Sequence, residues 1–180
     1  MEIKVENVVA SSSAEAPLDL QKISMRLEDA EYVPEKFPGL IYKLKEPKTA
    51  LLLFTSGKIV CTGAKNVEMV NKAVNTVLGE ISKLDIDVTD DPEIIIQNIV
   101  ATSDLKKELN LNSLAISLGL EKVEYEPEQF PGLVYRVDEP RVVALLFGSG
   151  KIVCTGAKVV EDIEIALNEI VRELTDAALI

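Results

Sequence analysis

The sequence is dominated by an internal repeat. The decapeptide SGKIVCTGAK at 56–65 returns unchanged at 149–158, and FPGL at 37–40 returns at 130–133, both with an offset of 93 residues. VENVVAS around Asn7 likewise resembles IQNIVAT around Asn98, at an offset of 91. Copies of about 90 residues are too long to be solenoid units, so they predict a duplicated domain with a pseudo-twofold axis. We expect one repeat over 1–91 and the other over 92–180, together forming one pseudo-symmetric molecule.

Hydrophobic periodicity changes in the same order within each repeat. Residues 3–9 alternate as a strand does, and residues 18–29 place apolar side chains at helical spacing. A strand-rich block from about 32 to 62 follows, with turn signals at Pro38-Gly39, Glu46-Pro47 and Ser56-Gly57. Each repeat closes with an amphipathic helix, over 66–83 in the first copy and 159–174 in the second. This order predicts an α+β fold with helices on one face of a curled antiparallel sheet.

The opposite face of this sheet has no predicted helix to cover it. Alternation along the repeated strand KIVCT puts Ile59 and Cys61 on the helix side and leaves Val60 and Thr62 on the other. The same rule adds further side chains to the uncovered face: Asn7, Val9, Leu52 and Phe54. An apolar face rimmed by lysine indicates a surface that binds a partner.

Charge is unevenly distributed along the chain. The net charge of −11, from 19 basic and 30 acidic residues, argues on its face against a nucleic-acid or anionic-membrane partner. However, segments 36–65 and 129–158 carry +5 and +2, which leaves −18 for the remainder. A phosphate-bearing partner on the basic sheet side is therefore compatible with the charge. No apolar stretch approaches the roughly 20 residues that cross a bilayer, and the N-terminus is unlike a signal peptide, so we expect no membrane contact and no secretion.

Several chemistries lack their usual residues. Histidine is absent, and two cysteines are too few for a disulfide framework or a four-thiolate zinc site. We therefore expect no catalytic residue, no metal and no cofactor, and we interpret Cys61 and Cys154 as small buried hydrophobes rather than a redox pair. The segment GSGK at 148–151 lacks the spacing of a phosphate-binding loop. The acidic run at 85–93 is interpreted as a solvated linker rather than a cation site.

Two rival functions are weighed against a binding role. A nucleic-acid-processing enzyme would need a catalytic Asp or Lys on the uncovered face, where alternation places no acidic residue. A sheet that sequesters an apolar small molecule should be closed and neutral, whereas this face is open and rimmed by lysine.

Every aromatic residue of the chain is duplicated, although aromatics make up only 4% of it. The matched pairs are Phe37 with Phe130, Phe54 with Phe147, Tyr32 with Tyr125 and Tyr42 with Tyr135. Core Phe exchanges with other apolar residues when packing allows. The strict matching therefore indicates either a shared role or shared ancestry with ordinary core packing.

Three segments together resemble one known family. VENVVAS, EYVPEKFPGLIYKLKEPKTALLLFTSGKIVCTGAK and EYEPEQFPGLVYRVDEPRVVALLFGSGKIVCTGAK are similar, in order and over essentially the whole chain, to the TATA-box-binding proteins. The resemblance implies a two-fold duplicated saddle, a curved ten-stranded antiparallel sheet with helices on its convex face. It also implies a general transcription factor rather than an enzyme. Such a factor binds the minor groove of A·T-rich TATA-box DNA, kinks it and nucleates the preinitiation complex.

The resemblance also implies a role for individual positions. The kinking aromatics would be Phe37, Phe54, Phe130 and Phe147. The minor-groove base contacts would be Asn7, Val9, Leu52, Val60, Thr62, Asn98, Val100, Leu145, Val153 and Thr155. The phosphate contacts would be Lys43, Lys58, Lys65, Arg136, Lys151 and Lys158. Because Lys43 matches Arg136, the two ends of this phosphate clamp are expected to differ.

The implied protein partners are transcription factor B and the RNA polymerase preinitiation complex. The acidic loop EYEPEQF at 124–130 resembles the surface that docks transcription factor B, with Glu126 and Glu128 as its contacts. Val33 stands in place of Glu126 in the first repeat, so a partner can distinguish the two ends. The sequence does not decide whether the chain forms a homodimer when it is free of DNA. The acidic composition resembles archaeal members, which implies a cytoplasmic, nucleoid-associated protein.

Overall fold

The computed structural model describes all residues from 1 to 180 and contains ten strands and four helices. The strands form one sheet in the order β2-β3-β4-β5-β1-β6-β10-β9-β8-β7, and the pairs within each repeat are antiparallel. The predicted α+β class, with ten antiparallel strands, is confirmed. The elements are β1 (Lys4–Ser13), α1 (Leu20–Arg26), β2 (Ala30–Glu31), β3 (Leu40–Lys45), β4 (Lys48–Leu53), β5 (Lys58–Ala64), α2 (Val67–Ser82), β6 (Ile95–Asp104), α3 (Leu111–Leu118), β7 (Val123–Glu124), β8 (Leu133–Val137), β9 (Val142–Leu146), β10 (Lys151–Ala157) and α4 (Val160–Asp176).

Contacts divide the chain into two compact units, and each unit includes a short segment of the other repeat. The first-repeat unit is Asn7–Gln97, and the second-repeat unit is Met1–Glu6 with Asn98–Ile180. The attachments match, because the Ser12 hydroxyl donates to the Glu93 carbonyl and the Ser103 hydroxyl to the Glu2 carbonyl, each at 2.7 Å. The expected boundary between residues 91 and 92 concerns the duplication rather than these contacts, and it stays a prediction.

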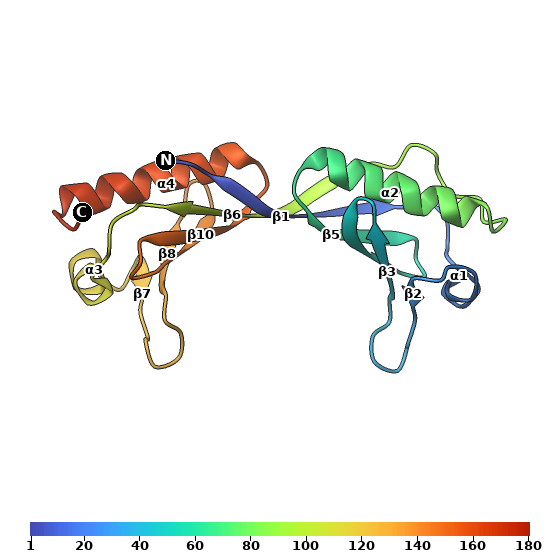
Figure 1. Cartoon of the computed structure of the whole chain (residues 1–180), viewed down its shortest axis with the longest axis horizontal. Helices are drawn as coiled ribbons and strands as arrows, with labels where there is room; N and C mark the ends of the chain where they lie inside the picture. Colours follow the sequence, from blue (N-terminus) through green and yellow to red (C-terminus); the bar gives the residue numbers. More distant parts are fainter. The chain divides into compact units, whose positions relative to one another are not determined.

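Each unit buries its core between a long helix and one face of its strands. In the first-repeat unit α2 lies along the strands, and in the second-repeat unit α4 does so (Figure 1). The buried stripe of α2 is Val70, Ala73, Val74, Val77, Leu78 and Ile81, and that of α4 is Ile163, Ala166, Leu167, Ile170 and Leu174. Cys61 and Cys154 are buried under these helices, and burial raises the pKa of each thiol to about 11. The prediction that both cysteines are small buried residues is confirmed.

Three of the four helices begin at a side-chain cap. Asp19, Asn66 and Asn110 each accept a hydrogen bond from a backbone N–H in the first turn of α1, α2 and α3. α4 begins after Val159, whose side chain supplies no such bond. Val159 follows β10 as Asn66 follows β5, the matching strand of the first repeat. No helix has the length and apolar character needed to span a membrane.

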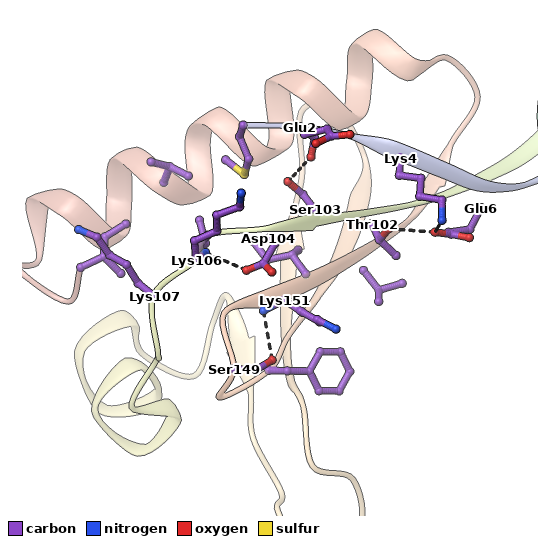
Figure 2. A pocket seen from close by; sticks show the side chains of 17 residues that line it. Glu2, Lys4, Glu6, Thr102, Ser103, Asp104, Lys106, Lys107, Ser149 and Lys151 are labelled. Carbon is purple, nitrogen blue, oxygen red and sulfur yellow. Dashed lines mark hydrogen bonds and ion pairs between the residues drawn. The ribbon is translucent and has the colours of Figure 1, made fainter.

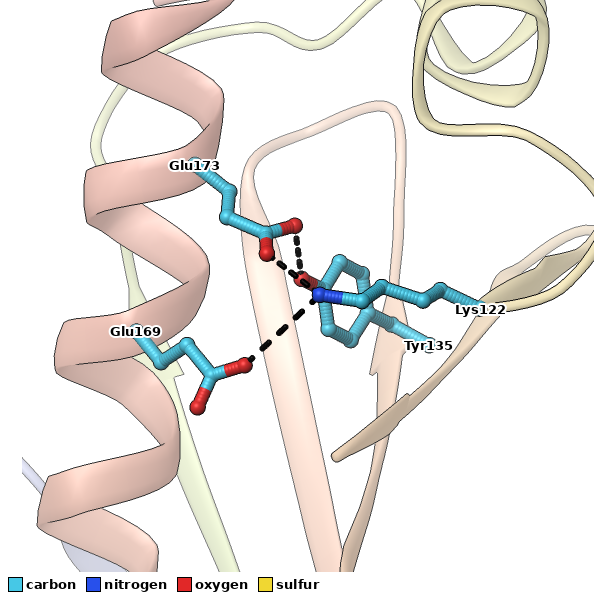
Figure 3. Close-up of polar contacts among 4 residues, drawn as sticks. All are labelled: Lys122, Tyr135, Glu169 and Glu173. Atoms are coloured by element: carbon cyan, nitrogen blue, oxygen red, sulfur yellow. Dashed lines mark hydrogen bonds and ion pairs between the residues drawn. The ribbon is translucent and has the colours of Figure 1, made fainter. Parts of the chain in front are cut away.

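A polar cluster ties α4 to the strands of the second-repeat unit (Figure 3). The Lys122 ammonium lies 2.5 Å from one oxygen of Glu173 and 4.0 Å from Glu169, and the buried Tyr135 hydroxyl donates to Glu173. Burial raises the pKa of Tyr135, and its bond to Glu173 raises it further. Burial alone would also raise the pKa of Glu173, but the hydrogen bonds from Lys122 and Tyr135 outweigh it and lower that pKa. Glu173 is therefore held ionised at the helix–sheet junction.

Candidate nucleic-acid interface

The helix-free face of each unit carries five of the ten residues predicted to contact bases. Side chains alternate along β5, where Ile59 and Cys61 are buried while Val60 and Thr62 are half-buried. The ten predicted positions are all half-buried. This is the exposure expected of side chains that lie on a sheet with no helix above them.

Cross-strand register aligns part of this set in matching rows. In the first-repeat unit one row contains Ser11, Val60, Leu52 and Ile41. In the second-repeat unit the matching row contains Thr102, Val153, Leu145 and Val134. The end members of these rows were not among the predicted contacts, although the same alternation would have found them.

One carboxylate also reaches this face. The Thr102 hydroxyl donates to Glu6 at 3.2 Å, and Glu6 pairs with Lys4 at 3.5 Å. Alternation along β1 had placed no acidic residue there, because it gives the strand direction but not the reach of a flexible side chain across to β6.

An asparagine is held in a fixed orientation on the helix-free face of each unit. The Gly63 N–H donates to the Asn7 carbonyl oxygen at 2.7 Å, and the Asn7 amide donates to the Thr62 hydroxyl at 3.3 Å. Asn98 repeats this arrangement with the Gly156 N–H at 2.7 Å and with Thr155 at 3.0 Å. Because the carbonyl oxygen is taken by the backbone, the amide group turns its donors toward the surface. An amide has two such donors, so one remains for a ligand.

Both asparagine anchors depend on a glycine in the left-handed region. Gly63 has φ 89° and Gly156 has φ 100°, values that residues other than glycine rarely adopt. The register of β5 with β1, and that of β10 with β6, shifts at this place, which is typical of a bulge that re-aims the backbone N–H.

The four phenylalanines form two edge-to-face pairs with the same geometry. Phe37 meets Phe54, and Phe130 meets Phe147, each with ring centroids 5.9 Å apart and planes at 66°. Phe130 is 40% exposed, so part of its ring is available to a partner. The structure therefore brings together the rings that the sequence had only matched by position.

Gly39 and Gly132 make room for these ring pairs, and sequence reasoning missed them. A Cβ at Gly132 would lie 2.7 Å from the Phe130 ring and 3.0 Å from the Phe147 ring, and one at Gly39 would lie 2.8 Å from Phe37. The repeated FPGL was the signal that could have found them, because the glycine recurs two residues after each phenylalanine.

All six predicted phosphate-contacting cations are exposed, and the expected asymmetry takes a definite form. Arg136 donates to the Glu124 carboxylate at 3.3 Å, with both side chains more than half exposed. Its counterpart Lys43 lies in a strand row with Ala50 and Thr62 on the helix-free face. The guanidinium is thus partly occupied by a carboxylate of its own unit.

The predicted loop residues Glu126 and Glu128 are exposed between β7 and β8. The N–H groups of Gln129 and Phe130 both donate to the Glu126 carbonyl at 3.0 Å, and the first repeat forms the same turn on the Val33 carbonyl. The two loops therefore share a backbone and differ in side-chain chemistry.

The chain matches a known family over most of its length. The family described as "Transcription factor TFIID (or TATA-binding protein, TBP)" matches residues 2–84 and 93–177. The chain is 60% identical over 178 residues to the TATA-box-binding protein of Thermoplasma acidophilum, covering 99% of this chain and 97% of that protein. It is 55% identical over 177 residues to the one of Archaeoglobus fulgidus, covering 98% and 97%.

A solved structure gives the same result for the fold. The chain is similar to the Methanococcus jannaschii TBP with a TM-score of 0.89 and 52% identity, covering 98% of this chain and 99% of that one. The matched family is one of DNA-binding transcription factors, which decides against the enzyme and small-molecule alternatives. The chain belongs to the transcription factor TFIID, or TATA-binding protein, family.

Proposed function

We propose that the chain is a general transcription initiation factor that binds TATA-box promoter DNA with the helix-free faces of its two units. Two observations support the proposal, family membership and the matching residues on the two faces. The observation that carries it is the anchored asparagine of each unit. Asn7 and Asn98 each keep an amide donor at the surface of an otherwise apolar face.

The chemistry of this face fits the minor groove at A·T pairs. The groove edge of such a pair presents only acceptors, A N3 and T O2, whereas a G·C pair adds an amino donor. Amide donors from Asn7 and Asn98 suit the acceptors, and the half-buried Val60 and Val153 would meet a guanine amino group without accepting from it. The face therefore favours A·T-rich sequence.

The phenylalanine pairs suit the role of wedges. Prying open a base step costs a few kcal/mol, which an apolar ring offsets by stacking on the exposed base and by letting a bent duplex contact more protein. In each pair the two rings contact each other and pack on a glycine. Since pyrimidine–purine steps such as TA are easily kinked, such wedges add to the sequence preference.

Transcription factor B is the proposed protein partner of the loop that carries Glu126 and Glu128. This loop has Glu126 where its counterpart has Val33, and Gln129 where its counterpart has Lys36, so it is the more acidic of the two loops. Assembly of RNA polymerase on the complex would follow. Because the similar proteins named above are archaeal, the proposed location is the archaeal cytoplasm, together with the nucleoid.

A gel-shift experiment tests both parts of the proposal. The chain is expected to retard a TATA duplex at concentrations at least about tenfold below those needed for a G·C-substituted duplex. Adding transcription factor B should supershift the complex of the parent chain. The Glu126→Arg variant should bind the TATA duplex as the parent does and lose the supershift, while the matched Val33→Arg variant should keep it.

Equal affinity for the two duplexes would disprove the proposed DNA preference. A full supershift by the Glu126→Arg variant would instead disprove the assigned protein contact and leave the DNA proposal intact.

A further inference from the structure

The second-repeat unit contains an open groove of about 1090 Å³ beside its N-terminal segment (Figure 2). Its apolar wall includes Met1, Val171 and Ile180, and its polar lining includes four lysines and three carboxylates. The labelled side chains come from residues 1–6, from the end of β6 with the two lysines after it, and from the turn before β10 with the first residue of that strand. All of these residues belong to one compact unit.

In the first-repeat unit the chain itself fills the matching place. After α2, residues 84–91 run back toward β6, and the Thr89 N–H donates to the Ala14 carbonyl at 2.9 Å. Ala14 corresponds to Leu105 at the offset of 91, and each residue follows a strand. The Ala14 N–H donates to the Gly57 carbonyl at 2.8 Å, and the Leu105 N–H donates to the Gly150 carbonyl at 2.9 Å. Leu105 lines the groove.

The correspondence continues up to the last residue after α4. Asp85 has φ 61° and its counterpart Ala178 has φ 57°, so both helices end in the same left-handed residue. At this offset of 93 Ile180 corresponds to Asp87, and at the offset of 91 Met1 corresponds to Pro92. Both Ile180 and Met1 line the groove, and between their first-repeat counterparts lie residues 88–91, the segment VTDD. The groove is therefore the place that VTDD occupies in the first-repeat unit.

The lysines of the groove define the charge of a suitable occupant. Lys106 and Lys107 stand where the first repeat has Glu15 and Ala16, and both are exposed and absent from every ion pair. Four lysines line the groove against three carboxylates, whereas the positions that match these residues in the first-repeat unit hold one lysine and two carboxylates. An acidic occupant is thus favoured more strongly than in the first-repeat unit.

We propose that this groove binds a short, extended, acidic segment of a partner protein, with an apolar residue followed by two carboxylates as in VTDD. Its apolar residue packs against Val171 and Ile180, one backbone N–H donates to the Leu105 carbonyl as Thr89 does to Ala14, and its carboxylates meet Lys106 and Lys107. Charged contacts of this kind add to the binding free energy that a short peptide gains from one hydrogen bond and one apolar side chain.

The probe is a fluorescent peptide with the sequence of residues 84–92, LDIDVTDDP, titrated with the whole chain and followed by anisotropy. DNA is left out, because Phe147 and Lys151 line the groove and belong to the proposed DNA face. We expect saturable binding of one peptide per chain below about 1 mM. The Lys106→Glu/Lys107→Glu variant should bind at least about tenfold more weakly, as should a peptide with both C-terminal aspartates changed to asparagine. The matched variant Lys72→Glu, on the exposed side of α2 in the other unit, should bind as the parent does.

Three outcomes would overturn the proposal. They are absence of saturable binding, equal weakening by Lys72→Glu, and sedimentation of the chain as a dimer that excludes the peptide, which would make a second copy the occupant. Each is distinct from failure of the DNA proposal, because the Lys106→Glu/Lys107→Glu variant leaves the predicted DNA contacts in place and can be checked by gel shift.

Discussion

Gly132 and Gly39 decide how the phenylalanine rings meet. Neither glycine has a positive φ, so the requirement comes from space rather than from backbone conformation. A methyl group at Gly132 would press on both Phe130 and Phe147. Both rings can give way, because they sit at the half-exposed edge of their unit rather than in its core. A substitution there should displace the ring pair without unfolding the chain.

The Gly132→Ala variant is therefore expected to bind a TATA duplex with about fivefold lower affinity and to bend it less. Phe147→Ala, which removes one ring of the pair, should have the same effects to a larger degree. Resonance energy transfer between dyes at the two ends of the duplex measures the bend. Gly79→Ala is the control, because a Cβ there meets nothing within 4 Å. It should leave bending unchanged and stabilise α2 by about 1 kcal/mol. Normal bending by Gly132→Ala would argue against the ring pair as the wedge.

At the scale of elements, the two long helices form the same layer with different termini. Asn66 caps α2, because its side chain accepts from the Met69 N–H at 2.8 Å. Val159 stands at the matching position before α4. Val159 has extended φ and ψ of −136° and 150° and is 48% exposed, so it contributes little to the core. α4 instead has Glu161 and Asp162 in its first turn, where carboxylates interact favourably with the helix dipole.

Val159→Asn should therefore add a cap to α4 and raise the free energy of unfolding by about 1 kcal/mol. The reciprocal Asn66→Val should lower it by a similar amount. Urea denaturation followed by circular dichroism measures both. If Asn66→Val destabilised the chain while Val159→Asn had no effect, the entry of the chain into α4 would not present the N–H groups for capping.

The cluster around Glu173 predicts a pH dependence that only the second-repeat unit has. The pKa of Glu173 is lower in the folded chain than in the unfolded chain. Its contribution to the free energy of unfolding is therefore complete above the unfolded-state pKa and is lost as the pH falls through the folded-state pKa. Glu173→Gln should lower the free energy of unfolding by about 1 kcal/mol at neutral pH, a modest value because the carboxylate is partly exposed, and by less at about pH 3. Urea denaturation at the two pH values measures the difference. Glu80→Gln in α2 is the matched control, because Glu80 pairs with the exposed Lys83 at 3.1 Å and accepts no hydrogen bond from a tyrosine. A Glu173→Gln cost that did not shrink in acid would contradict this role.

At the scale of the whole molecule, net charge and local charge have opposite signs. The chain carries −11, yet the six predicted phosphate contacts are all exposed cations. The acidic remainder discourages contact with DNA elsewhere, because it repels phosphates that approach from other directions. The net charge thus favours one orientation of the partner rather than excluding it.

Affinity for DNA should fall steeply with salt. If all six cations contact phosphates, the logarithm of the binding constant should fall with the logarithm of salt concentration with a slope of about −5. Lys151→Ala should reduce the magnitude of the slope by about 1, and Lys72→Ala should leave it unchanged. Titrations at several salt concentrations measure the slope, and a value near zero would remove the phosphate contacts from the proposal.

The sequence by itself determined the duplication, the α+β order and which side chains share the helix-free face. These features are local, since a period of two residues in strands and 3.6 in helices assigns each side chain to a face. Only the tertiary structure decided how Asn7 and Asn98 are anchored by a glycine on another strand, how the rings pair over Gly39 and Gly132, and that residues 1–6 pack with the second repeat. It also decided that Thr89 returns to bond with Ala14 in the first-repeat unit, and that an open groove lies beside residues 1–6 in the other. Such features depend on contacts between segments far apart in the chain, which no local periodicity encodes.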